Sequence, residues 1–284
     1  MTICIGALCT SEAPGDTVVL ASDRMVTWIG TQFEHPVPKI HSVCPTAQVL
    51  IAGDALAGED VVRRAHVQLA GAPVPVKDAA EAVANSYGDE RMGRAEAQVL
   101  KPRGLTLAQF YQMHQQLVPQ ITGGLDTALA AFDLGVELIV AGVDGAGGHL
   151  HTVMNPGGIQ ICHDLIGYIA VGSGGTHALQ SMIGLHHSPS QSLTQAVFQV
   201  LTSKQRAEVA PGVGRETDLI VIGRDGPRSL APGSLERLDE LCARTARDAD
   251  AAVQRQAAQL QLEFEAISGE TGSAGEVVQG DGSP

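Results

Sequence analysis

Thr2 is the first residue after Met1 and the first whose side chain could do chemistry. If Met1 is removed, Thr2 carries both a hydroxyl and a free α-amine. An α-amine titrates near pH ~8, so part of it can accept a proton at neutral pH. Such an amine can serve as the base that activates the hydroxyl of its own residue. The start of the chain therefore predicts a threonine nucleophile, although an edge strand beginning at Thr2 is the simpler interpretation.

Four further residues stand next to apolar runs and could complete such a site. Asp23 follows VVLAS at 18–22, Lys39 precedes Ile40, Gly53 follows VLIA at 49–52, and Ser173 lies in AVGSGG at 170–175. Each has a simpler interpretation. Asp23 could cap a strand end and Lys39 could be a solvated charge. Gly53 could merely permit a turn, and Ser173 could be a helix N-cap. An exposed Asp–Lys pair would contribute only ~0–1 kcal/mol. Their occurrence together with Thr2 favours a catalytic set.

These motifs, in this order, resemble the proteasome β-type subunits and their bacterial relatives, in the family of N-terminal-nucleophile hydrolases. The resemblance covers roughly residues 2–223, and the intervals from Asp23 to Lys39 and from Lys39 to Gly53 match the family. The segments that carry it, besides Thr2, are VVLASDR at 18–24, KI at 39–40, IAGD at 51–54, LIVAGVD at 138–144, NPGG at 155–158 and AVGSGG at 170–175.

The resemblance implies a role for each residue. The ammonium at Lys39 would favour the deprotonated forms of the Thr2 amine and hydroxyl. Asp23 would pair with Lys39 and hold it, and Ser173 would hydrogen-bond near the terminal amine. The backbone N–H of Gly53 would face the developing oxyanion, where losing one donor typically costs ~100- to 1,000-fold in rate. The expected activity is that of a threonine-type endopeptidase.

One stretch departs from the family pattern. The family often has an Asp and then Ser-Gly shortly before the last strand, whereas this chain has Val213-Gly214 at the matching place. The departure keeps a second hypothesis open, a non-catalytic structural subunit of the same fold. A third hypothesis is an N-terminal-nucleophile amidohydrolase that acts on a small amide.

The remaining patterns predict an α+β fold: a four-layer αββα sandwich of two antiparallel sheets flanked by helices, the fold of the resembled family. A turn is expected at Glu12–Asp16. Asp54 and Ser192 are expected to cap helices, Ser192 with the capping-box partner Gln195. Strands are predicted at 2–9, 17–21, 39–43, 47–52, 137–143, 149–153, 168–171 and 218–223, and helices at 54–69, 77–87, 107–117, 178–185 and from 192.

The chain shows no internal repeat or composition break over 1–267, which predicts a single domain that includes a long C-terminal helix at about 234–266. Residues 268–284 are rich in glycine and acidic side chains and lack Lys and Arg, so a disordered tail is expected there.

The composition of the chain limits the classes of molecule that it is expected to bind. The net charge is −13, without a basic stripe, which argues against nucleic acid and anionic membranes as partners. The start of the chain lacks a signal-peptide pattern and the five cysteines are scattered, so we expect a cytoplasmic protein with reduced core cysteines. The resemblance implies a homo-oligomeric ring that acts on peptides or unfolded proteins and leaves room for a partner ATPase.

No cofactor and no metal is predicted. His149 and His151 alternate along a strand and share a face, but no third ligand stands nearby in sequence, so a half-solvated face is the preferred interpretation. The pair His186-His187 at a helix end is interpreted as structural. Gly172–Gly175 lacks the remaining residues of a phosphate-binding loop, which argues against nucleotide binding.

Overall fold

The computed structural model describes residues 2–28 and 31–272. It is a mixed α+β structure with antiparallel sheets, which confirms the class predicted from the sequence. Contacts divide the chain into two compact units, Met1–Leu235 and Glu236–Pro284. The first unit holds every strand of the described residues and every residue of the predicted site.

The first sheet contains the strand that follows Thr2. Its strands pair antiparallel in the order β10-β1-β2-β11-β12. The central strands β1 and β2 are buried along their whole length, because their apolar runs are covered on both faces. The five strands are β1 (Cys4–Cys9), β2 (Thr17–Asp23), β10 (Tyr168–Val171), β11 (Thr217–Gly223) and β12 (Gly226–Ser229).

The second sheet contains the strands that flank Lys39 and Gly53. Its strands also pair antiparallel, in the order β5-β6-β7-β8-β9. Ile139 and Leu150 point to one face of this sheet, and Leu138 and Val140 point to the other. The five strands are β5 (Ile40–Cys44), β6 (Ala47–Gly53), β7 (Val136–Asp144), β8 (Gly147–Val153) and β9 (Ile161–Cys162).

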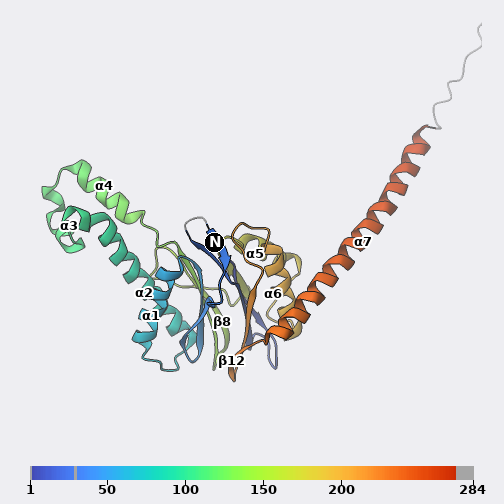
Figure 1. Cartoon of the computed structure of the whole chain (residues 1–284), viewed down its shortest axis with the longest axis horizontal. Helices are drawn as coiled ribbons and strands as arrows, with labels where there is room; N and C mark the ends of the chain where they lie inside the picture. The colour runs from blue at the N-terminus through green and yellow to red at the C-terminus, as the bar shows by residue number, and fades with distance from the viewer. Residues whose placement is uncertain (1, 29–30, 273–284) are drawn as a thin grey trace, which may run out of the picture. The chain divides into compact units, whose positions relative to one another are not determined.

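The two sheets pack face to face and each carries a pair of helices on its outer side (Figure 1). Leu20, Leu50, Ile139 and Leu150 belong to the aliphatic core between the sheets. The approach is close: a Cβ added to Gly6 would lie 2.9 Å from Leu150 Cδ2. The outer helices are α1 (Ala55–Leu69) and α2 (Val76–Ala95) on the second sheet, and α5 (Gly175–Gly184) and α6 (Leu193–Ala207) on the first.

Both predicted helix caps are confirmed. Asp54 Oδ1 accepts hydrogen bonds from the backbone N–H groups of Leu56 and Ala57, each at 3.0 Å, at the start of α1. Ser192 and Gln195 form a reciprocal capping box at the start of α6. These side chains satisfy N–H groups that the first turn of a helix leaves without partners.

The region between α2 and β7 is more helical than the sequence predicts. α2 continues into a π-helical turn (Glu96–Leu100) and a 3-10 turn (Lys101–Arg103), followed by α3 (Leu107–Met113), a 3-10 turn (His114–Gln116) and α4 (Pro119–Ala130). α4 was not predicted, since Gly123-Gly124 at its centre disfavours a helix.

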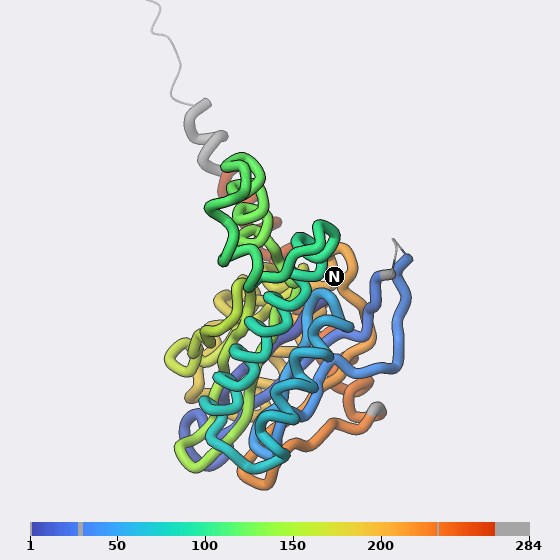
Figure 2. The backbone as a smooth tube through the Cα atoms, turned by 90° about the vertical axis from the view of Figure 1, so that its left-hand side faces the viewer, coloured from blue at the N-terminus to red at the C-terminus, as the bar shows by residue number. Residues whose placement is uncertain are grey.

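A small core stabilises this helical region in spite of the glycines. Phe110 of α3 packs there with Leu125 and Leu129 of α4 and with Leu100. Figures 1 and 2 both show α3 and α4 beyond the end of the sheets. Tertiary packing therefore outweighs the local propensity of α4.

The sequence also failed to predict the hairpin of β3 (Met25–Trp28) and β4 (Thr31–Glu34), which form a two-stranded sheet of their own. β4 is exposed or half-exposed throughout, so it lacks the alternation of buried and polar residues that identifies a strand. β9 and β12 are short and exposed and were missed for the same reason.

The C-terminal helix α7 (Pro232–Gly272) is longer than predicted at both ends. Residues 268–272, expected in the disordered tail, are helical, and 273–284 lie outside the described residues. The division between the two units falls at Leu235, near the start of α7, and the single domain over 1–267 stays a prediction.

The cysteines match the predicted core positions in part. Cys4, Cys9 and Cys44 are buried, but Cys162 in the short strand β9 is exposed. Across the described residues, no helix combines the length and the apolar character needed to cross a bilayer.

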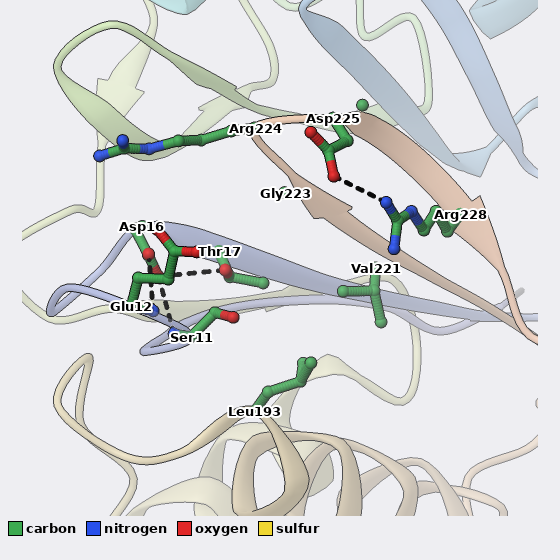
Figure 3. Close-up of a pocket in the computed structure, with 11 residues that line it drawn as sticks. Ser11, Glu12, Asp16, Thr17, Leu193, Val221, Gly223, Arg224, Asp225 and Arg228 are labelled. Atoms are coloured by element: carbon green, nitrogen blue, oxygen red, sulfur yellow. Dashed lines mark hydrogen bonds and ion pairs between the residues drawn. The ribbon is translucent and has the colours of Figure 1, made fainter.

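Asp16 closes the predicted turn between β1 and β2 (Figure 3). Its carboxylate accepts hydrogen bonds from the backbone N–H groups of Ser11 at 2.8 Å, Glu12 at 2.9 Å and Ala13 at 3.0 Å, and from the Thr17 hydroxyl at 3.1 Å. Burial alone raises the pKa of Asp16, but these hydrogen bonds outweigh it and lower the pKa to about 2. The cavity of about 370 Å³ beside Asp16 shares no lining residue with the predicted site.

Asp16→Asn should reduce the acid sensitivity of the fold. The folded pKa of about 2 lies below the unfolded value of about 3.9, so the carboxylate stabilises the fold above pH ~4. That contribution is lost as the pH falls through about 2. Between pH 5 and pH 2 the free energy of unfolding, from urea titrations followed by circular dichroism, should fall less in the variant than in wild type. If the free energy of unfolding fell equally with pH in the variant and in wild type, Asp16 would not be the source of this acid sensitivity.

Candidate active site

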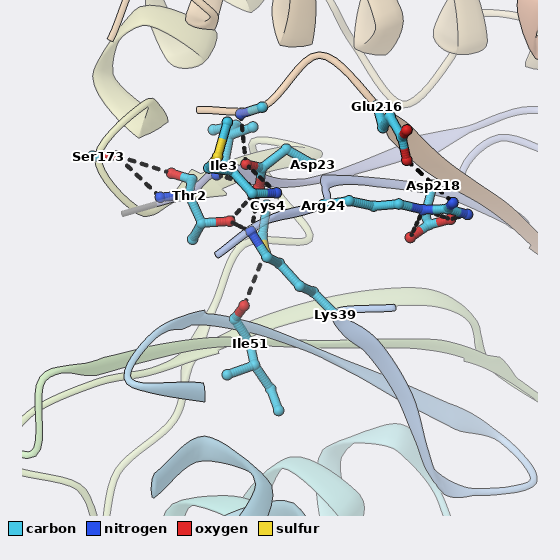
Figure 4. Close-up of polar contacts among 12 residues, drawn as sticks. Thr2, Ile3, Cys4, Asp23, Arg24, Lys39, Ile51, Ser173, Glu216 and Asp218 are labelled. Atoms are coloured by element: carbon cyan, nitrogen blue, oxygen red, sulfur yellow. Dashed lines mark hydrogen bonds and ion pairs between the residues drawn. The ribbon is translucent and has the colours of Figure 1, made fainter. Parts of the chain in front are cut away.

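Four of the five predicted site residues come together at one end of the facing sheets (Figure 4). Thr2 lies just before β1, and Asp23 is the last residue of the neighbouring strand β2. Lys39 directly precedes β5, and its carbonyl accepts a 3.0 Å hydrogen bond from Ile51 of β6. Ser173 lies in the turn between β10 and α5. Strand pairing therefore gathers residues that are far apart in the sequence.

The Thr2 hydroxyl contacts both charged side chains. It donates a hydrogen bond to Asp23 Oδ1 and accepts one from Lys39 Nζ. Lys39 Nζ also donates to Asp23 Oδ1, at 2.7 Å. Thr2 is 2% exposed and Asp23 is fully buried, while the Lys39 side chain is 14% exposed. The pair is therefore a buried ion pair with a hydroxyl held between its charges, and not the solvated pair of the simpler interpretation.

Backbone groups fix the orientation of the Asp23 carboxylate. Oδ1 also accepts from the Ile3 N–H at 3.1 Å, and Oδ2 accepts from Met25 N–H at 3.2 Å and from Gly214 N–H at 2.8 Å. A buried charge is tolerated where its hydrogen-bonding capacity is satisfied in this way. Gly214 belongs to the stretch that departs from the family pattern, and its backbone supplies a donor to the site.

Ser173 contacts the backbone of Thr2 on both sides. Its Oγ accepts a hydrogen bond from Thr2 N at 3.1 Å and lies 3.3 Å from the carbonyl oxygens of Thr2 and Pro211, to which it can donate. The N-cap of α5 is Gly174, and no side chain caps that helix. The interpretation of Ser173 as a helix cap is therefore wrong, and its hydroxyl faces the nitrogen that removal of Met1 would free.

Gly53 shares a cavity with this cluster. It ends β6 with φ of +97°, and an added Cβ would overlap the carbonyl oxygen of Gly135, so a side chain is excluded there. Within the described ranges, no hydrogen bond joins Gly53 to Thr2. Its expected role as an oxyanion donor is implied by the resemblance and stays a prediction, and Gly53 does lie in the cavity wall.

The cavity in front of Thr2 has a volume of about 520 Å³. The sequence did not single out most of its wall, because those residues come from the segments around β7, β8 and β10. Glu137 Oε2 accepts a 2.6 Å hydrogen bond from Gly172 N–H and so fixes the turn that carries Ser173. The lining residues are Thr2, Gly53, Asp133, Gly135, Val136, Glu137, Met154, Asn155, Gly172 and Ser173.

A charged residue within an otherwise apolar strand is the signal that could have identified Glu137, in the run VELIVAGV. Together with Asp133 it gives the cavity two carboxyl groups. This wall would favour a cationic group on a bound molecule over an anionic one.

Cys4 is the nearest thiol to the site along the chain, and it is not a competing nucleophile. Burial raises its pKa strongly, and the opposing effect of the Lys39 charge is smaller. The thiol donates toward the Ile51 carbonyl oxygen at 3.5 Å. Because the thiolate is the reactive form, a thiol kept neutral by burial is inert.

Comparison of the chain with protein-family models and with curated proteins gave no match. The function of the site is therefore inferred from its geometry and from the sequence motifs.

Asp23→Asn should destabilise the protein by at least about 3 kcal/mol, because it leaves the Lys39 ammonium without its buried counter-charge. The matched control is Asp225→Asn, since Asp225 and Arg228 form a pair with side chains 80% and 73% exposed. The control should change stability by no more than about 1 kcal/mol. Urea unfolding measures both, and equal small effects would show that the Asp23–Lys39 pair contributes little.

Proposed function

We propose that this chain is a threonine-type peptidase with the N-terminal-nucleophile hydrolase fold, resembling a bacterial proteasome-like subunit. The observation that carries the proposal is the position of the Thr2 hydroxyl between Asp23 and Lys39, with Ser173 on the Thr2 nitrogen. The two facing sheets with helices on both outer sides are consistent with that fold. Activity requires the removal of Met1, because only a free amine can act as the base.

The first half of the reaction forms an ester. The Thr2 amine takes the hydroxyl proton while Thr2 Oγ attacks the carbonyl carbon of a peptide bond. As the tetrahedral intermediate collapses, the C–N bond breaks and the amine passes its proton to the leaving nitrogen. The acyl group of the substrate is then joined to Thr2 Oγ, and the other fragment departs with a free amino group.

The second half of the reaction consumes water. The Thr2 amine removes a proton from a water molecule, whose oxygen attacks the ester carbonyl. The C–O bond to Thr2 breaks and Thr2 Oγ regains a proton. Lys39 favours the ionising hydroxyl through its positive charge, and Asp23 holds Lys39 in place. The Gly53 N–H is the proposed donor to the oxyanion in both halves.

The non-catalytic subunit remains the main rival, because the chain lacks the Asp and Ser-Gly of the family pattern. The hydrogen bond from Gly214 N–H to Asp23 favours the catalytic proposal, since the departing stretch still takes part in the network. A small-amide hydrolase would use the same nucleophile and differs in substrate.

Assembly into a ring and a partner ATPase rest on the resemblance alone. Light scattering of the purified protein distinguishes a ring, which requires many subunits per particle, from a small amidohydrolase that acts outside any ring. A small particle that cleaves only small amides would favour the amidohydrolase.

Removal of Met1 should leave Thr2 as the reactive residue. Intact-mass spectrometry should find the purified chain without Met1, and a threonine-directed electrophile should add its mass once per chain. Thr2→Ala should abolish the adduct and peptide cleavage, while Thr2→Ser, which keeps a hydroxyl, should retain part of both.

A chain that keeps Met1 would support the structural-subunit hypothesis, since the base would be missing. Labelling that persists in Thr2→Ala would place the nucleophile elsewhere.

Lys39→Met should lower peptide turnover by about 100-fold or more, because the ionising hydroxyl loses its adjacent positive charge. The matched control is Lys101→Met, whose side chain is 61% exposed and which should keep wild-type turnover. Peptide cleavage followed by mass spectrometry measures both variants. Near-normal turnover in Lys39→Met would remove Lys39 from the mechanism.

A further inference from the structure

Two histidines share the face of the second sheet that α1 and α2 cover, on the side opposite the core between the sheets. His149 and His151 of β8 stand opposite Gly142 and Val140 of β7, and the intervening Leu150 points into the core between the sheets. The sequence predicts this common face but assigns the pair no function, because no third ligand is close to it in the chain.

His151 is 4% exposed, and within the described part of the chain neither of its ring nitrogens has a hydrogen-bond partner. Buried polar side chains are rarely left in this state, since the group gives up its hydrogen bonds to water and gains none in return. The imidazole therefore offers a free lone pair inside the protein, next to His149, with the ring centroids 6.4 Å apart.

Asp164, in the segment between β9 and β10, is the missing third group. Its Oδ1 accepts a 2.7 Å hydrogen bond from Leu150 N–H, which fixes the carboxylate against β8. Its Oδ2 lies 2.6 Å from His149 Nδ1. One ligand atom from each of His149, His151 and Asp164 lies within 4.8 Å of the others.

A fourth side chain orients His149. Asp144 Oδ1 lies 3.3 Å from His149 Nε2, on the side of the ring away from Asp164. A proton on Nε2 donated to Asp144 leaves the Nδ1 lone pair facing the Asp164 oxygen. When Nδ1 carries the proton instead, the 2.6 Å contact to Asp164 is a hydrogen bond, and a metal ion bound at Nδ1 would take the place of that proton. A carboxylate behind the imidazole is also the usual arrangement around a metal-binding histidine.

We propose that His149, His151 and Asp164 form a binding site for a divalent transition-metal ion, with Zn²⁺ as the representative ion. Two imidazole nitrogens and one carboxylate oxygen are ligands that Zn²⁺ accepts, with water in the fourth position. Ligands of tetrahedral zinc lie about 3.3 Å apart, so Asp164 and His149 separate slightly when the ion enters.

The neighbouring basic side chains, His163 and Lys77, do not take the place of an ion in this site. His163 Nε2 is engaged with the Thr152 hydroxyl at 2.9 Å, and Lys77 at the start of α2 is exposed. The carboxylates of Asp144 and Asp164 offset the positive charge that Lys77 and an ion would bring together.

The metal site lies apart from the proposed catalytic centre. Val136 lines the cavity in front of Thr2, whereas Asp144 contacts His149, and the two residues stand at opposite ends of β7. Eight residue steps along a strand span about 26 Å. The ion would link Asp164 to β8 and stabilise that end of the sheet, without touching the reacting atoms.

Titration of chelator-treated protein with Zn²⁺ in a calorimeter tests the site. Wild type should bind one ion per chain, and its melting temperature should rise with Zn²⁺ concentration, because the ion binds only the folded state. His151→Ala should weaken binding by about 100-fold or more and remove the thermal shift. Asp164→Asn removes the carboxylate charge but keeps an oxygen that can accept from Leu150 N–H. It should also weaken Zn²⁺ binding, and it tests the site if His151→Ala fails to fold.

Two further variants separate this site from other zinc ligands. His114→Ala, an exposed histidine of another element, should bind Zn²⁺ as wild type does. Cys162→Ser should do the same, although Cys162 pairs with His151 in the sheet. Absence of binding to wild type, or equal binding by wild type, His151→Ala and Asp164→Asn, would overturn the proposal. Loss of binding in Cys162→Ser would overturn this ligand set.

Discussion

The buried carboxylate of Asp23 is the interaction on which the rest of the site depends. It accepts hydrogen bonds from the Thr2 hydroxyl, the Lys39 ammonium and three backbone N–H groups. Those donors come from the segment just before β1, from the start of β3, from the segment before β5 and from the stretch before β11. A charge without water must be satisfied by the protein itself, so these segments can assemble correctly only together. The same contacts that stabilise this end of the sheets therefore orient the hydroxyl.

Much of this arrangement could be predicted from the sequence because its signals are local. Apolar runs identified the central strands, and Asp54 and Ser192 identified two helix starts through capping chemistry. Asp23 and Lys39 stood at the ends of such runs, and strand pairing then brought them to Thr2. The positions of residues at the ends of regular strands and helices can therefore be predicted from local sequence patterns.

The parts that could not be predicted depend on contacts between distant segments. α4 forms across two adjacent glycines because Leu125 and Leu129 pack with Phe110, and no local propensity reveals that. The donor from Gly214 is a backbone group and carries no side-chain signature. Asp164 joins His149 only because the segment after β9 folds back over β8.

The hydrogen bond between Ser173 and the Thr2 nitrogen has a consequence for when the proposed enzyme becomes active. It is present while that nitrogen is still part of a peptide bond, so Ser173 is in position before the initiator residue leaves. Under the proposed function, the cut that exposes the amine would free a nitrogen that already lies beside the Ser173 hydroxyl. An aminopeptidase that acts on the nascent chain would then control when the amine is released, and access to the cavity would control activity afterwards.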